Sequence, residues 1–102
     1  MDAREKEQVL SDLIQIHSVN GNELAVANYL HSLFARHGLA ATVAPFGNQR
    51  ANLILEAGHG DRVLGLTSHM DTVAVGDPAA WHHPPFAATR TGDRIYGRGA
   101  PD

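Results

Sequence analysis

A run of mostly apolar residues at positions 63–68 leads directly into His69 and, two residues later, Asp71. Clusters of glycine, aspartate and proline bound this run on both sides. A short continuous apolar run between turn signals is typical of a strand that is covered on both faces. We therefore expect residues 63–69 to form an interior strand of an α/β domain, flanked by helices.

His69 and Asp71 make a His-x-Asp triplet at the end of this expected strand. Because strand side chains alternate between faces, both should point to one side, with their Cα atoms about 6.5 Å apart. A metal-bound imidazole usually donates its other N–H to a carboxylate or a carbonyl, which fixes the ring. The triplet is short enough to arise by chance, so a histidine without a chemical role remains an alternative. Its place at the carboxyl end of a strand, where open α/β sheets bind ligands, favours a metal or catalytic site.

Composition limits the class of protein. A chain of 102 residues, with 43% hydrophobic and 19% charged residues, suits one small globular domain. A net charge of -3 and scattered basic residues argue against nucleic-acid binding. The absence of a long apolar stretch or a signal peptide predicts no membrane association and a cytoplasmic location. With no cysteine and seven histidines, any metal would be bound by His, Asp and Glu.

Two amphipathic segments precede the apolar run. Apolar residues at helical spacing predict helices over about residues 3–17 and 22–37. Asn20, followed three residues later by Glu23, resembles a capping box that would open the second helix. Gly38 is expected to end it.

Two strands are expected between the second helix and the apolar run, at residues 40–46 and 52–56, paired antiparallel. Pro45 cannot donate a ladder hydrogen bond, which favours the sheet edge for the first of them. The predicted fold class is therefore α/β, with two helices, then a mixed sheet of about three strands, then a long ordered loop. In that loop only residues 94–96 suggest a strand.

The loop ends in a second candidate ligand. Gly97-Arg98-Gly99 suggests a tight backbone passage, and Pro101 restricts the backbone before Asp102. A carboxylate on a constrained backbone is a good candidate ligand. The adjacent His82 and His83 would point in different directions on most backbones, so substrate contact is a better expectation for them than a paired metal site.

Taken together, these motifs resemble a known family. Ser-His-Met-Asp-Thr-Val at residues 68–73 and Ile-Tyr-Gly-Arg-Gly-Ala-Pro-Asp at 95–102, with Trp81 between them, carry the likeness. The sequence resembles the dinuclear zinc hydrolases of the acetylornithine deacetylase, succinyl-diaminopimelate desuccinylase, aminoacylase and glutamate carboxypeptidase group. Residues 18–23 and 52–54 also look like earlier landmarks of that family, so the resemblance covers nearly the whole chain.

The resemblance implies a fold and a set of roles. Residues 1–102 would be the N-terminal portion of a zinc-exopeptidase-like, three-layer α/β/α catalytic domain, without the lid or dimerisation domain. His69 would ligate one metal, Asp71 would be the catalytic-site residue that orients His69, and Asp102 would bridge two zinc ions, with cobalt or manganese as possible substitutes. The family's glutamate pair and later ligands have no counterpart here. Pro101 departs from the small or hydroxyl residue usual at that position.

The activity implied for the longer enzyme is hydrolysis of the amide bond of N-acyl amino acids by a metal-activated water, with a glutamate as general base. Gly-Arg-Gly at 97–99 and Trp81 look more like the deacetylase and desuccinylase branch. A dipeptidase or carboxypeptidase of the same family, acting on short peptides, stays open, as does a non-catalytic remnant that serves as a binding or structural module. The resemblance implies a homodimeric parent, and we expect the 102 residues alone to be inactive.

Overall fold

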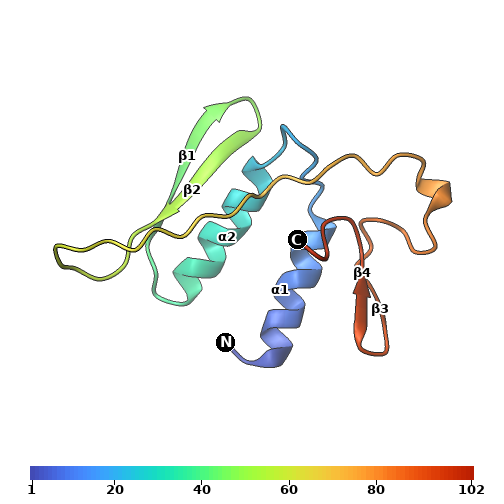
Figure 1. The fold of residues 1–102 in the computed structure, drawn as a ribbon, viewed down its shortest axis with the longest axis horizontal. Coiled ribbons are helices and arrows are strands. Elements are labelled where there is room, and N and C mark those ends of the chain that lie inside the picture. The colour runs from blue at the N-terminus through green and yellow to red at the C-terminus, as the bar shows by residue number, and fades with distance from the viewer. The chain divides into compact units, whose positions relative to one another are not determined.

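The computed structural model describes every residue from 1 to 102, and these residues divide into two compact units. One unit combines residues 1–20 with residues 72–102, and the other comprises residues 21–71. Figure 1 labels the helices and strands of both. Two helices followed by short antiparallel hairpins make this a small α/β chain.

Helix α1, Ala3–Gln15, opens the first unit and confirms the predicted amphipathic helix. It begins after Asp2, whose side chain accepts a hydrogen bond of 2.8 Å from the Glu5 backbone N–H. Such a cap satisfies one of the N–H groups that the first turn leaves without a helical partner. Ile14, near the other end, is the buried residue of the helix.

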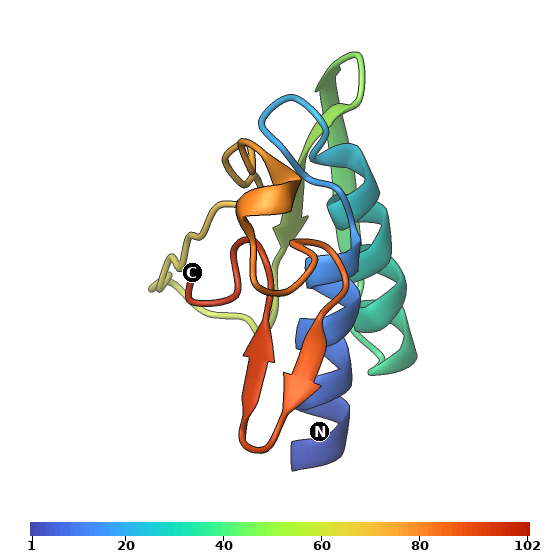
Figure 2. The ribbon, with the colours of Figure 1, turned by 90° about the vertical axis from the view of Figure 1, so that its right-hand side faces the viewer.

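The second half of this unit contains the 3₁₀ turn η1, Pro78–Ala80. An antiparallel hairpin comes after it, made of β3, Thr89–Thr91, and β4, Arg94–Tyr96. Figure 2 shows the hairpin beside α1. An ion pair between Arg90 and Glu7 and a hydrogen bond from Gln15 to the Ala87 carbonyl join this part of the chain to the helix. The strand expected at residues 94–96 is confirmed, and the three residues of β3 were not anticipated.

Two close approaches fix the chain around this hairpin. A Cβ built on Gly97 would lie 2.2 Å from Cγ2 of Ile14, so only glycine fits there. Thr72 forms a parallel bridge with Val19, in which its N–H donates to the Ser18 carbonyl at 2.8 Å and its carbonyl accepts from Asn20 at 2.9 Å. The tight passage predicted at Gly97 is thus present.

The second unit consists of helix α2, Leu24–Arg36, and an antiparallel hairpin of β1, Ala41–Gly47, and β2, Arg50–Leu55. The helix packs on the hairpin, and the residues buried in its small core are Val26, Ala27, Leu33 and Ala51. The pairing is regular from Ala41 opposite Leu55 as far as Pro45, after which the register shifts. Both predicted strands and their antiparallel pairing are confirmed.

The predicted capping box at the start of α2 is wrong. The residue at the N-cap position is Glu23, and its side chain makes no capping hydrogen bond. That side chain is instead turned into a buried ion pair. Neither α1 nor α2 is long and apolar enough to cross a membrane.

The interior strand predicted at residues 63–69 is wrong for this structure. The segment has neither helix nor strand, and Figure 1 draws it as an irregular run leaving the β1–β2 hairpin. Val63, Leu64 and Leu66 are 91%, 84% and 89% exposed. A strand needs a neighbour to accept and donate its backbone hydrogen bonds, and in this unit β1 and β2 pair with each other alone.

The predicted mixed sheet of about three strands is wrong for the same reason. The structure contains two separate two-stranded antiparallel sheets, β1–β2 and β3–β4. The apolar composition of residues 63–68 correctly indicated a segment suited to burial, but composition alone does not supply a pairing partner.

Candidate metal centre

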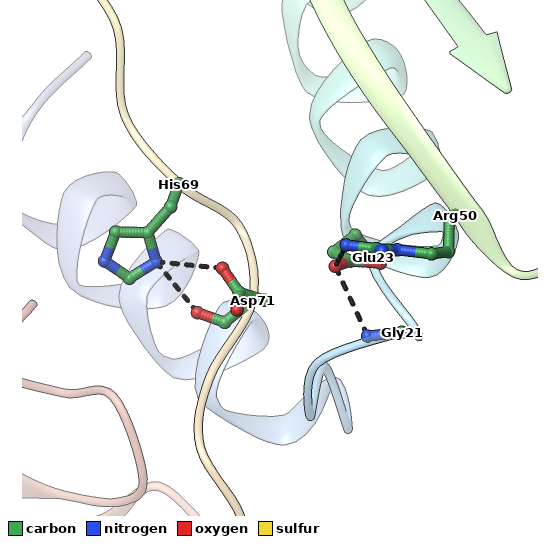
Figure 3. A network of polar contacts seen from close by, with 5 residues as sticks. All are labelled: Gly21, Glu23, Arg50, His69 and Asp71. Carbon is green, nitrogen blue, oxygen red and sulfur yellow. Dashed lines mark hydrogen bonds and ion pairs between the residues drawn. The ribbon is translucent and has the colours of Figure 1, made fainter. Parts of the chain in front are cut away.

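The side chains of His69 and Asp71 meet at the end of the irregular segment, as Figure 3 shows. Nδ1 of His69 lies 2.9 Å from the backbone carbonyl oxygen of Asp71 and 3.4 Å from its carboxylate Oδ1. Both acceptors lie on one side of the ring. The prediction that these two residues act together is compatible with this geometry, although the backbone here is irregular instead of a strand.

This contact determines which ring nitrogen of His69 can act as a ligand. With its proton on Nδ1, the imidazole donates to Asp71, and the Nε2 lone pair is then free to bind a cation. The His69 side chain is 64% exposed, so the ring is accessible. A histidine oriented by a carbonyl and a carboxylate is the arrangement usual for metal-binding imidazoles.

A second ionic contact of the same unit joins Glu23, at the start of α2, to Arg50, at the start of β2. The guanidinium Nη2 donates to Oε1 of Glu23 at 2.8 Å and Nε donates to Oε2 at 3.2 Å. Gly21 adds a backbone N–H to Oε1 at 3.3 Å, seen in Figure 3. The hydrogen bonds from Arg50 are the main cause that lowers the pKa of Glu23 to about 2.

The pKa of Arg50 is raised, chiefly by its hydrogen bonds with Glu23 and to a smaller extent by the negative charges of Glu23 and Asp71. Arg50 therefore experiences two carboxylates, one in the ion pair and one beside His69. The guanidinium also lies 4.9 Å from the ring centre of Phe46, a cation–π contact.

Asp102 lies in the other unit, at the end of a turn. The Asp102 N–H donates to the Gly99 carbonyl at 3.1 Å, and the Ala100 N–H donates to Gly97 at 3.3 Å. Gly99 has a positive φ of 78°, and a Cβ on it would be 2.8 Å from Cγ2 of Thr72. The constrained backbone expected before Asp102 is present, and its side chain is exposed.

An arginine–tryptophan contact holds the loop that leads to this turn. The Arg98 guanidinium lies 4.8 Å from the ring centre of Trp81, and its Nη2 donates to the Ala74 carbonyl at 3.3 Å. The indole N–H of Trp81 donates to the Val75 carbonyl at 2.9 Å. These contacts make the long loop after residue 72 an ordered one, as predicted.

A cavity of about 510 Å³ lies next to this turn, lined by Trp81, His82, His83, Ile95, Tyr96, Gly97, Ala100 and Pro101. The His83 ring packs against Tyr96 with the ring centres 4.2 Å apart. The two adjacent histidines are not part of any cluster of metal-binding side chains.

The predicted ligands are therefore distributed over both units. His69 and Asp71 contact each other in one unit, and Asp102 belongs to the other, so a metal ion shared by His69 and Asp102 stays a prediction. No three histidine or acidic side chains in the chain form a cluster that could hold a metal. An imidazole nitrogen and carboxylate oxygens are nevertheless donors that zinc accepts.

The Glu23–Arg50 ion pair was missed by reasoning from the sequence. Glu23 was assigned to a capping box and Arg50 to a turn, and no regular spacing links a residue before a helix to one at the start of a strand. The sequence feature that could have indicated it is the position of Glu23 next to the apolar face of a helix. A carboxylate that is buried there is costly and needs a cationic partner.

Part of the sequence that carries this site matches the profile of a known family. The profile described as Peptidase family M20/M25/M40 matches residues 65–102, a segment that contains His69, Asp71 and Asp102.

Individual relatives extend the likeness to nearly all of the chain. A protein of Staphylococcus aureus (strain MRSA252) named "Probable succinyl-diaminopimelate desuccinylase" is 38% identical over 99 residues, which is 97% of this chain and 24% of that protein. "Succinyl-diaminopimelate desuccinylase" of Orientia tsutsugamushi (strain Boryong) is 33% identical over 97 residues, covering 93% of this chain and 25% of that protein. The chain thus spans about a quarter of the length of the curated relatives it matches.

The profile match includes both expected ligand motifs, and these two relatives match 97% and 93% of the chain. These findings confirm the resemblance seen in the sequence. The chain is therefore similar to the peptidase family M20/M25/M40.

Proposed function

We propose that residues 1–102 are the N-terminal portion of the catalytic domain of a zinc-dependent hydrolase. The enzyme cleaves the amide bond of N-acyl amino acids, with N-succinyl substrates favoured by the names of the relatives. The single observation that carries the proposal is the orientation of His69, whose Nδ1 faces both acceptors of Asp71 while the exposed ring leaves Nε2 for a metal.

Each candidate residue has a separate role in this proposal. His69, through Nε2, and Asp102, through its carboxylate, would hold the metal, and Asp71 would hold the His69 ring and its tautomer. Zinc would polarise the substrate carbonyl and activate a water molecule. The complete site would lie in a three-layer α/β/α domain.

The 102 residues alone are proposed to bind zinc weakly and to hydrolyse nothing. Catalytic zinc sites usually have three protein ligands per ion, and this chain offers two candidates in all. A general base typically contributes about 10² to 10⁴ in rate. No residue of this chain is proposed for that role. A homodimeric parent, and cobalt or manganese in place of zinc, stay predictions.

The test begins with the nucleotide sequence beyond codon 102, read for an adjacent Glu-Glu pair. The protein translated from the longer reading frame is then purified and assayed on N-succinyl and N-acetyl amino acids and on dipeptides. We expect hydrolysis of the N-acyl amino acids that is lost with a chelator and restored by zinc.

Variants assign the roles. His69→Ala and Asp102→Asn should abolish turnover and reduce the zinc content, whereas His31→Ala, on the exposed surface of α2, should leave both unchanged. Turnover of dipeptides in preference to N-acyl amino acids would replace the proposed substrate class. A longer protein that binds no metal and cleaves nothing would show that the chain is a binding or structural module.

A further inference from the structure

The hydroxyl of Thr72 is a buried polar group that the fold leaves without a hydrogen-bond partner. Most buried hydroxyls in folded proteins are hydrogen-bonded, because an unpaired one loses its hydration without compensation. The other such atom of the chain, Nε of Arg98, belongs to a guanidinium that donates through Nη2 to the Ala74 carbonyl. Thr72 has no second polar side-chain atom to compensate in this way, so its hydroxyl needs a separate explanation.

The backbone of Thr72 is fixed on both sides. Its N–H donates to the Ser18 carbonyl at 2.8 Å, and its carbonyl accepts from the Asn20 N–H at 2.9 Å, in the parallel bridge with Val19. These bonds join it to the segment that follows α1, in the same compact unit. The point from which the side chain projects is therefore set by the fold, and the torsion about its Cα–Cβ bond is what can change.

The side chains of Thr72 and Asp102 lie against the same glycine. The point that a Cβ on Gly99 would occupy is 2.8 Å from Cγ2 of Thr72 and 3.6 Å from Oδ2 of Asp102. The Gly99 carbonyl also accepts from the Asp102 N–H at 3.1 Å. All three residues belong to one compact unit. A threonine methyl group and a carboxylate oxygen thus border the space that the missing Gly99 side chain leaves.

A rotation of the Thr72 side chain would bring its hydroxyl into this space. Oγ1 and Cγ2 are bonded to the same carbon, which lies 3.9 Å from the Cβ point of Gly99. A hydroxyl and a methyl group are similar in size, so changing one staggered rotamer for another needs little additional room. The hydroxyl would then face the side of Gly99 on which Asp102 Oδ2 lies. A hydrogen bond from a hydroxyl to an ionised carboxylate is among the stronger ones in proteins.

We propose that Thr72 is a positioning residue for Asp102, to whose carboxylate its hydroxyl donates when a metal ion is bound there. This inference rests on the proposed metal-binding role of Asp102. Ligating carboxylates are usually hydrogen-bonded to outer partners that fix their orientation, and the loss of such a partner typically costs about 10- to 100-fold in metal affinity. In the metal-free chain the hydroxyl stays unpaired, so it lowers the stability there.

The experiment compares zinc affinity with stability in the 102-residue chain. Thr72→Val keeps the branched shape but removes the hydroxyl, whereas Thr72→Ser keeps the hydroxyl and removes the methyl group. Zinc binding is followed by NMR at the Asp102 carboxylate carbon, and urea unfolding of the metal-free chain is followed by circular dichroism. We expect Thr72→Val to weaken zinc binding about 10-fold and Thr72→Ser to stay within about 3-fold of the wild type.

The two readouts separate positioning from a merely structural role. Replacing an unpaired buried hydroxyl by a methyl group should leave the metal-free chain at least as stable, so the urea midpoint of Thr72→Val should not fall. A structural role predicts instead that zinc affinity falls only in variants whose midpoint falls. The matched control is Thr91→Val, which removes an exposed hydroxyl of the same unit and should change neither readout.

Circular dichroism also checks that each variant folds. If Thr72→Val does not fold, Thr72→Ser and Thr72→Ala make the same comparison, because they differ only in the hydroxyl. Equal zinc affinities with and without the hydroxyl at position 72 would overturn this inference and leave the metal role of Asp102 intact. A wild-type chain in which zinc leaves the Asp102 signal unchanged would contradict the proposed metal role, and this inference with it.

Discussion

Replacing Glu23 by glutamine should destabilise the chain at neutral pH and change how its stability depends on acid. Glu23→Gln keeps the size of the side chain and one oxygen acceptor but removes the charge that pairs with Arg50. Glu23 is almost completely buried, so water cannot replace the lost contact. The Arg50 side chain that remains is 40% exposed, so water can solvate its guanidinium, and this limits the loss of unfolding free energy.

The size of the effect follows from the pKa of Glu23. The folded chain lowers that pKa from 4.5 to about 2, a difference that corresponds to about 3 kcal/mol of unfolding free energy. Because Arg50 is partly exposed, solvent screening reduces the expected loss to about 1–2 kcal/mol. That amount is a large fraction of the total stability of a small domain.

The sign of the pH dependence follows from the direction of the shift. A carboxylate with a depressed folded-state pKa contributes stability that is fully present above its unfolded value of 4.5 and is lost as the pH falls towards about 2. The wild-type chain should therefore lose stability in that window, and Glu23→Gln should lose about 1–2 kcal/mol less there.

Urea unfolding followed by circular dichroism, repeated from about pH 7 to about pH 2.5, measures both effects. The matched control is Glu7→Gln, since Glu7 forms an exposed ion pair with Arg90 that should be worth less than about 1 kcal/mol. The reasoning is refuted if the unfolding free energies of wild type and Glu23→Gln run parallel across the whole pH range.

Other substitutions probe the packing and the exposed segment. Gly97→Ala should cost more than about 2 kcal/mol of unfolding free energy, because its Cβ would lie 2.2 Å from Ile14, whereas Gly65→Ala, with nothing within 4 Å, should cost less than about 0.5 kcal/mol; equal losses in urea unfolding would contradict this. Leu64→Ser with Leu66→Ser should leave stability within about 0.5 kcal/mol, since both side chains are exposed, but reduce self-association in analytical ultracentrifugation. An unchanged sedimentation profile would show that these residues do not mediate association.

The helices and the β1–β2 hairpin could be predicted because their signals are local. Apolar residues at helical spacing place α1 and α2, and the turn between β1 and β2 brings two short strands together without help from distant residues. Within each of these elements the hydrogen-bond partners lie close in sequence.

The absence of the strand expected at residues 63–69 could not be predicted from local signals. The segment's composition is that of a buried strand, but strand formation depends on a paired neighbour, and in this structure β1 and β2 pair with each other alone. The His69–Asp71 contact still forms, because two residues of separation suffice to bring the imidazole to the Asp71 carbonyl. The Glu23–Arg50 ion pair depends on tertiary packing of α2 against the hairpin and has no local signature.

The central claim is that His69 and Asp102 bind the same metal ion. The most direct measurement is a zinc titration of the 102-residue chain, monitored by NMR at the His69 imidazole nitrogens and at the Asp102 carboxylate carbon. Two ligands of one ion must respond with the same dissociation constant, with His69 changing at Nε2. We predict weak binding with coincident curves, which His69→Ala abolishes at both residues. Different dissociation constants at His69 and Asp102, or zinc binding that persists at Asp102 in His69→Ala, would contradict the account.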